Sequence, residues 1–153
     1  MSFSVYVAAS SRDIERAELA MNKLRDAGID VTSTWIDTIR KVGDANPQNA
    51  TNEQRRSWSG ADVAEVMNSD ALWLLMPKSP SFGATFEFGF AFAKGLVTWA
   101  SGPDHRTSIF TALATHQFDS DEDAFDDIVA FAEHVQCGFG SKSERIDSAS
   151  RRR

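Results

Sequence analysis

The sequence has 153 residues, of which 42% are hydrophobic, and a formal net charge of −6 at pH 7. This length suffices for one domain with a substantial core. The negative charge argues against a polymeric nucleic-acid partner, because such a protein needs a basic surface. No apolar run approaches the ~18 residues of a membrane span and no leader pattern is present, so we expect a soluble cytoplasmic protein. The single cysteine, Cys137, excludes an internal disulfide.

The first third of the chain alternates between strand and helix patterns. Residues 3–9 form an apolar, β-branched and aromatic run that predicts a buried strand. Residues 13–27 carry apolar side chains at helical spacing, and Gly28 ends the pattern. Strand composition returns in residues 29–35. A strand, helix and strand in this order predict two parallel strands joined by a right-handed crossover.

The next segment has no clear period. Residues 36–52 contain Gly, Pro and several Asn, which predicts a long loop, and such loops often act as functional lids. Thr51 or Asn52 can cap a helix over residues 53–67. Residues 71–76 are a continuous apolar run, which is typical of a strand buried on both faces of a parallel sheet.

The segment TFEFGFAF, residues 85–92, allows two interpretations. Its phenylalanines alternate as in a strand, yet the apolar runs 71–76 and 96–100 require a crossover between them, so we predict a helix. Such a helix would be apolar around most of its circumference and therefore buried on nearly every side. This predicts a homodimer whose interface lies near Phe88 or Phe92.

The remaining elements complete an α/β fold. Residues 96–100 and 115–118 have strand composition, and residues 121–135 have a helical pattern with an acidic first turn. We expect a doubly wound, flavodoxin-like parallel sheet of five strands in the order 2-1-3-4-5, with helices on both faces. The expected domain spans residues 1–137, and residues 138–153, which end in three arginines, are expected to form a flexible tail.

In such a sheet a ligand binds beyond the carboxyl ends of the first and third strands. The loop after the first strand contains Ser10, Ser11 and Arg12 ahead of a helix, which is a plausible phosphate cradle. Alternatively, a serine there serves only as a helix cap. The loop has neither a Walker lysine nor a GxGxxG run, so no P-loop or dinucleotide site is predicted.

Two carboxylates are candidates for catalysis. Glu87 lies among phenylalanines, and burial of a carboxylate is costly unless it is paired or used. A helix N-terminus would keep it ionised, as a nucleophile requires. Asp62, on the helix before the third strand, can supply the second carboxylate that glycosidic chemistry needs. For both residues the alternative is an ordinary solvent-exposed position.

Aromatic and imidazole side chains give weaker indications. Trp58 and Trp35 could stack on a nucleobase or simply pack in the core. The three histidines are dispersed and have no metal-ligand spacing, so neither a metal nor another cofactor is predicted.

At this point the sequence resembles a known family. Residues 80–95 resemble the signature of the nucleoside 2-deoxyribosyltransferase superfamily, Gly-x-x-x-Glu-x-Gly-x-Ala, whose places are taken by Gly83, Glu87, Gly89 and Ala91. In that family the glutamate is the nucleophile. Asp62 and Asp70 fall close to the family's aspartates before the third strand.

One branch of this superfamily fits best. Tyr6, Ser10 and Arg12 fall at the spacings of the 2′-deoxynucleoside 5′-phosphate N-hydrolases. Six residues before the glutamate, the transferases carry an aspartate that holds the sugar, whereas the phosphate-specific hydrolases carry a serine, as Ser81 is here. A carboxylate there would repel a 5′-phosphate. In the hydrolases a serine of the neighbouring subunit completes the phosphate site, and Ser108 is the candidate.

The resemblance implies a hydrolase that cleaves the N-glycosidic bond of a (deoxy)nucleoside 5′-monophosphate to a free base and a sugar 5-phosphate. In this hypothesis Ser10, Arg12 and Ser81 bind phosphate, and Glu87 attacks C1′. Asp62 assists proton transfer or binds the sugar. The alternatives are a nucleoside 2-deoxyribosyltransferase and a non-catalytic nucleotide sensor. The segment 36–52 matches no pattern of this family and is expected to shape the base pocket, so the sequence does not predict the identity of the base.

Overall fold

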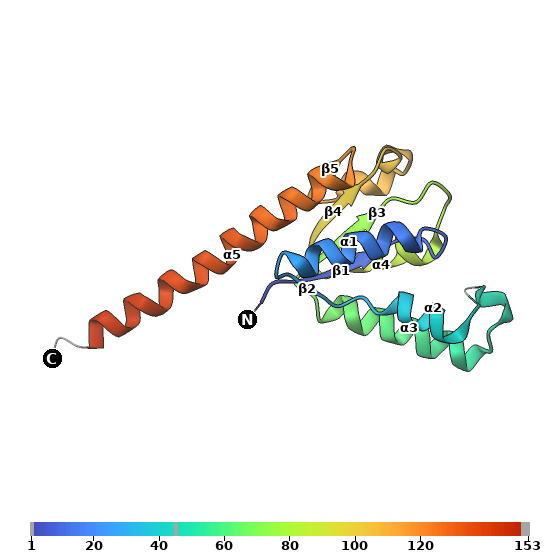
Figure 1. The fold of residues 1–153 in the computed structure, drawn as a ribbon, viewed down its shortest axis with the longest axis horizontal. Coiled ribbons are helices and arrows are strands. Elements are labelled where there is room, and N and C mark those ends of the chain that lie inside the picture. The colour runs from blue at the N-terminus through green and yellow to red at the C-terminus, as the bar shows by residue number, and fades with distance from the viewer. Residues whose placement is uncertain (1, 45, 151–153) are drawn as a thin grey trace.

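The computed structural model describes the backbone of residues 2–44 and 46–150 and the side chains of that range up to residue 138. Its core is a five-stranded, all-parallel sheet in the order β2-β1-β3-β4-β5 (Figure 1). The predicted fold class and strand order are therefore confirmed. The strands are β1 (Ser4–Ala8), β2 (Asp30–Val31), β3 (Ala71–Leu75), β4 (Val97–Ser101) and β5 (His116–Phe118).

Helices cover both faces of the sheet (Figure 1). On one face α1 (Ile14–Asp26) packs against α5 (Asp121–Ser150), and on the other α3 (Asn52–Met67) packs against α4 (Phe82–Ala93). A shorter helix, α2 (Trp35–Val42), contacts α3. This arrangement leaves the carboxyl ends of β1 and β3 open between the two helical layers, as the doubly wound topology predicts.

The central strands β1 and β3 form the middle of the core. All five residues of β3 are buried, and Val5 and Val7 of β1 are fully buried beside them. The two strands pair in parallel, with Tyr6 opposite Leu72. Both faces are covered by helices, which explains why these strands appear in the sequence as continuous apolar runs rather than as alternating patterns.

The phenylalanine-rich segment is a helix, as predicted, but it is not buried on nearly every side. The Ser81 side chain caps α4 by accepting a hydrogen bond from the backbone N–H of Ala84. Residues at helical spacing then form one buried stripe, namely Ala84, Glu87, Phe88 and Ala91. Three other phenylalanines of the helix are exposed within the single chain, Phe82 at 93%, Phe86 at 59% and Phe92 at 46%.

The region between β2 and α3 differs from its prediction. The second strand comprises Asp30–Val31 alone, and Trp35 begins α2 instead of ending a strand. A short 3-10 helix, Pro47–Asn49, follows, so the segment 36–52 is not a featureless loop. The signal for α2 was present in the sequence, because its apolar residues recur at helical spacing and Gly43 ends it with a left-handed φ of 73°.

The last helix is longer than expected. It was predicted over residues 121–135, and α5 instead continues to Ser150. The expected domain boundary at residue 137 falls inside this helix, and the flexibility of the segment after it stays a prediction. The arginines at 151–153 lie outside the described residues. Within the described part of the chain, no helix combines the length and the apolar character that a bilayer crossing demands.

Candidate active site

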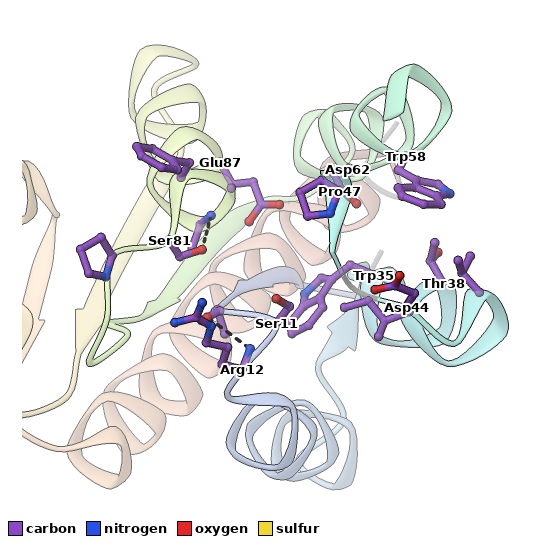
Figure 2. A pocket seen from close by; sticks show the side chains of 18 residues that line it. Ser11, Arg12, Trp35, Thr38, Asp44, Pro47, Trp58, Asp62, Ser81 and Glu87 are labelled. Carbon is purple, nitrogen blue, oxygen red and sulfur yellow. Dashed lines mark hydrogen bonds between the residues drawn. The ribbon is translucent and has the colours of Figure 1, made fainter. Parts of the chain in front are cut away.

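A cleft of about 430 Å³ lies at the carboxyl ends of β1 and β3, where the winding of the sheet reverses (Figure 2). Its walls come from four parts of the chain: the loop after β1, the helix α2 with the turn that follows it, the helix α3, and the start of α4. Most of the residues predicted from the sequence line it, namely Ser10, Arg12, Trp58, Asp62, Ser81, Gly83 and Glu87.

Glu87 lies in the second turn of α4, on the buried stripe of that helix, with 9% of its surface exposed. The hydroxyl of Tyr6, a fully buried residue of β1, donates a hydrogen bond of 2.9 Å to its Oε1. This contact fixes the carboxyl group, and Glu87 also lines the cleft. Within residues 2–44 and 46–138 no hydrogen bond engages the second oxygen, Oε2, so this oxygen can meet a ligand.

Burial and, to a smaller extent, the nearby charge of Asp62 raise the pKa of Glu87 to about 8, although the hydrogen bond from Tyr6 opposes the shift. Glu87 is thus mostly protonated at neutral pH in the free protein. The expectation that the helix N-terminus keeps it ionised was wrong. The helix field weakens beyond the first turn, and at the sixth residue of α4 desolvation outweighs it.

Asp62 faces the same cleft from α3 (Figure 2). Its burial, together with the charge of Glu65, raises its pKa to about 6. Because Glu87 and Asp62 repel each other when both are ionised, the pair titrates as a unit. Between about pH 6 and about pH 8 the two carboxyl groups hold one proton between them. An arrangement of this kind separates an acid from a base within one site.

Hydroxyl groups and a guanidinium line another part of the cleft. The Ser10 Oγ accepts from the backbone N–H of Arg12 at 3.2 Å, but it does not cap α1, whose N-cap is Asp13, so the helix-cap alternative for that loop was wrong. The Ser81 Oγ caps α4. Both serines line the cleft, beside the exposed Arg12. The N-terminus of a twelve-residue helix adds backbone N–H donors suited to an anion.

Opposite this end, the cleft has an apolar wall. Trp35 is buried, and its indole N–H donates to the carbonyl of Val7 at 3.0 Å, so its ring is held in place. Trp58 of α3 lines the cleft on this side, as do five residues of the segment 36–52, which was expected to shape the base pocket, namely Thr38, Ile39, Val42, Asp44 and Pro47. These five were not named individually from the sequence, because the segment was interpreted as a loop without helical spacing.

Three predicted residues do not line the cleft, namely Tyr6, which contacts Glu87 from β1, together with Ser108 and Asp70. Ser108 lies between β4 and β5, where its side chain accepts from the backbone N–H of Phe110. Asp70 accepts hydrogen bonds of 2.8 Å from the backbone N–H and the hydroxyl of Ser4, and therefore joins β1 to the start of β3. Among the residues described, 2–44 and 46–138, no group of three or more His, Cys, Asp or Glu side chains is arranged to hold a metal ion.

Three solved structures share this fold. A 2-deoxyribosyltransferase of Bacillus psychrosaccharolyticus is similar with a TM-score of 0.63 at 17% identity, over 82% of this chain and 90% of that one. A CMP N-glycosidase of Clostridium botulinum gives 0.56 at 13% identity, over 84% and 98%. A conserved protein of Enterococcus faecalis gives 0.59 at 18% identity, over 88% and 99%. No family model and no curated protein matches the sequence.

The predicted fold is therefore confirmed, since the chain shares it with a 2-deoxyribosyltransferase and with a CMP N-glycosidase. Two of these proteins are enzymes whose names denote the transfer or hydrolysis of a nucleoside glycosidic bond. The chemistry of this chain has to be argued from its own residues.

Proposed function

We propose that this chain is a hydrolase that cleaves the N-glycosidic bond of a nucleoside 5′-monophosphate, releasing a free base and a sugar 5-phosphate. The observation that carries the proposal is the pair of carboxyl groups in one cleft, Glu87 held by Tyr6 and Asp62 beside it. Two carboxyl groups around an anomeric carbon are the usual requirement for glycosidic cleavage. The shared fold with a 2-deoxyribosyltransferase and a CMP N-glycosidase supports the same class of substrate.

In the proposed reaction, the ionised Oε2 of Glu87 attacks C1′ of the sugar and the bond from C1′ to the base nitrogen breaks. Asp62 gives its proton to the departing base. Water then attacks C1′ and gives its proton back to Asp62, and the bond from C1′ to Glu87 breaks to regenerate the carboxylate, so one water is consumed for each base and sugar 5-phosphate released. The Tyr6 hydroxyl orients the nucleophile through its hydrogen bond to Oε1.

The 5′-phosphate is assigned to the end of the cleft that carries Ser10, Arg12 and Ser81. A guanidinium and a helix N-terminus both favour a phosphate, and a serine hydroxyl can donate to it. An aspartate at position 81 would place a negative charge at the same helix N-terminus. Ser81 therefore favours a nucleotide over a free nucleoside.

We also propose a homodimer. The exposed phenylalanines of α4 support it, because Phe82 is 93% exposed and also lines the cleft, so a second copy packed there would cover both. Phe92 is half-exposed and could lie in such an interface, whereas Phe88 is buried inside its own chain and cannot. Ser108 of a second copy would complete the phosphate site, as the family resemblance implies. The cytoplasmic location stays a prediction from the sequence.

A second candidate function is transfer of the sugar from one base to another, which the similarity to a 2-deoxyribosyltransferase favours. The two reactions share the attack by Glu87 and differ in whether water or a base takes the sugar. The purified protein should be incubated with ribo- and deoxyribonucleosides and their 5′-monophosphates, with and without an acceptor base, and the products separated by chromatography.

Release of free base from monophosphates alone supports the hydrolase. A new nucleoside formed only when an acceptor base is present would replace it with the transferase. Binding of nucleotides without any turnover would leave a sensor. Static light scattering at micromolar concentration tests the dimer, and a monomeric mass would contradict it.

A further inference from the structure

Asp44 is a charged residue of the cleft to which the reaction gives no role. It follows α2 and lines the cleft together with Trp35 and Thr38 (Figure 2). Figure 2 shows these three residues on one side of the cleft, Arg12 and Ser81 on the other, and Glu87 and Asp62 above and between them in the view. If the phosphate binds at Arg12 and the sugar at Glu87, the base meets the side that holds Asp44.

The turn around Asp44 holds its carboxylate in one orientation. The backbone N–H of Asn46 donates to Oδ1 at 2.8 Å, and the amide N–H of Asn49 donates to Oδ2 at 2.7 Å. These hydrogen bonds keep the pKa of Asp44 below its usual range, so the group is ionised at neutral pH. A carboxylate has about four acceptor positions, and each oxygen here uses one of them within the turn. Both oxygens can still accept from a ligand.

We infer that Asp44 selects the base, and that the preferred substrates carry an exocyclic amino group on the edge that faces α2. This inference rests on the proposed function. An amino group donates to a fixed carboxylate, whereas a keto oxygen at the same position places two acceptors against each other. The rings of Trp35 and Trp58 can stack on any planar base and therefore provide affinity without selectivity between bases.

Selection by one hydrogen-bonding group can be strong when the group is buried, because the wrong substrate leaves it unpaired. Asp44 is exposed and water can replace a missing partner, so a smaller factor is expected. We expect kcat/KM for an amino base to exceed that for the matching keto base by about tenfold to a hundredfold.

The test uses matched pairs of monophosphates that differ in this group, CMP with UMP and AMP with IMP, in ribo and deoxy forms. Both kcat/KM and equilibrium binding by titration calorimetry are measured for each pair. In Asp44→Asn, the new side chain keeps an oxygen for the N–H of Asn46 and presents an NH₂ group in place of Oδ2 to the cleft, and Asn49 keeps its contact with the turn by rotating its amide oxygen toward that group. The preference should therefore fall to near unity or reverse toward the keto bases. Asp37→Asn, an exposed residue of α2 that does not line the cleft, is the matched control and should leave the preference unchanged.

The outcomes separate this inference from the proposed function. Equal kcat/KM and equal binding within both pairs would overturn the inference. An Asp44→Asn variant in which kcat/KM falls by the same factor for amino and keto substrates would also overturn it. The latter result would make Asp44 a purely structural residue of its turn. If no nucleotide is cleaved, yet amino nucleotides bind more tightly and Asp44→Asn removes that difference, the proposed function fails while the role of Asp44 stands.

Discussion

Two groups of ionisable side chains lie near the carboxyl ends of the strands, and their carboxyl groups behave in opposite ways. In the first, Asp121 at the start of α5 receives hydrogen bonds from Arg16 at 2.6 and 2.8 Å and from the Ser101 hydroxyl at 2.6 Å. Burial alone would raise the pKa of Asp121, but these contacts lower it. In the second, burial together with nearby like charges raises the pKa values of Glu87 and Asp62 to about 8 and about 6.

The difference distinguishes a structural site from a candidate catalytic one. Arg16 also donates to the carbonyl of Met76 at 2.8 Å, so it joins α1 to α5 and to the end of β3. The charge of Asp121 is thereby neutralised within the chain. In the described part of the chain Glu87 receives a neutral hydroxyl and no cation, so the charge of its ionised form is left to be neutralised by a ligand. Perturbed carboxyl groups that lie in a cleft without a cationic partner are characteristic of active sites.

The strongest test of this comparison is the substitution Glu87→Gln. The amide keeps the size of the side chain and can still accept from Tyr6, yet it cannot attack C1′, so kcat/KM should fall by at least about a thousandfold. Chromatographic assays of base release measure the loss. Activity within tenfold of the native protein would remove Glu87 as the nucleophile.

The same substitution should stabilise the fold. The raised pKa of Glu87 means that the native state binds more protons than the unfolded state between about pH 4.5 and about pH 8, so its stability falls as pH rises through this window. Glutamine removes that loss. Urea unfolding of both proteins should show a gain that is small at pH 5 and larger at pH 8, whereas a gain independent of pH would contradict the burial argument.

The next test sharpens the assignment of the phosphate end. In Ser81→Asp the new carboxylate still caps α4, since aspartate and serine are comparable N-caps. Its charge should repel a 5′-phosphate and lower kcat/KM for nucleotides by about tenfold to a hundredfold, with little change for nucleosides. Ser81→Asn caps the helix without a charge and serves as the control. Equal effects of both variants would assign Ser81 to helix capping alone.

These residues also show how far the sequence could be used for prediction. The order of the strands followed from the buried runs 71–76 and 96–100 and from the need for a crossover between them. Glu87 was identified because a carboxylate among phenylalanines is unusual. Its protonation was predicted wrongly, because desolvation depends on what α4 packs against, and no local spacing gives that.

Other parts of the site could not be found from local patterns. The role of Arg16 depends on Asp121, which lies 105 residues further along the chain. The hydrogen bond from Tyr6 to Glu87 joins residues 81 positions apart. Asp44 was missed for a different reason, namely that α2 was interpreted as loop, although its apolar spacing and Gly43 were visible.

On the structural side of the comparison, Asp121→Asn should lower stability without altering the chemistry. The substitution removes the charge that Arg16 neutralises. A partly buried ion pair of this kind should contribute about 2 kcal/mol to the free energy of unfolding. Thermal and urea unfolding measure the change. The control is Glu18→Gln, which breaks the exposed pair with Arg40 and should leave Tm within error. A loss of kcat/KM in folded Asp121→Asn would show that the two groups are coupled.

The smallest expected effect, and the most specific to the pair, is the pH dependence of kcat/KM. The productive form has Glu87 ionised and Asp62 protonated, and it is a constant fraction of the singly protonated pair. The profile should therefore be bell-shaped, with limbs near pH 6 and pH 8 and a fall of about tenfold one unit beyond either limb. The substrate phosphate also titrates near pH ~6, so the alkaline limb is the decisive one.

The variant Asp62→Asn tests the origin of that limb. Asparagine cannot lose a proton, so the alkaline limb should vanish in this variant. Its one remaining limb is the ionisation of Glu87, whose pKa should lie below 8 because the repulsion from Asp62 is gone. Persistence of the alkaline limb in Asp62→Asn would show that Asp62 binds the sugar without supplying the proton.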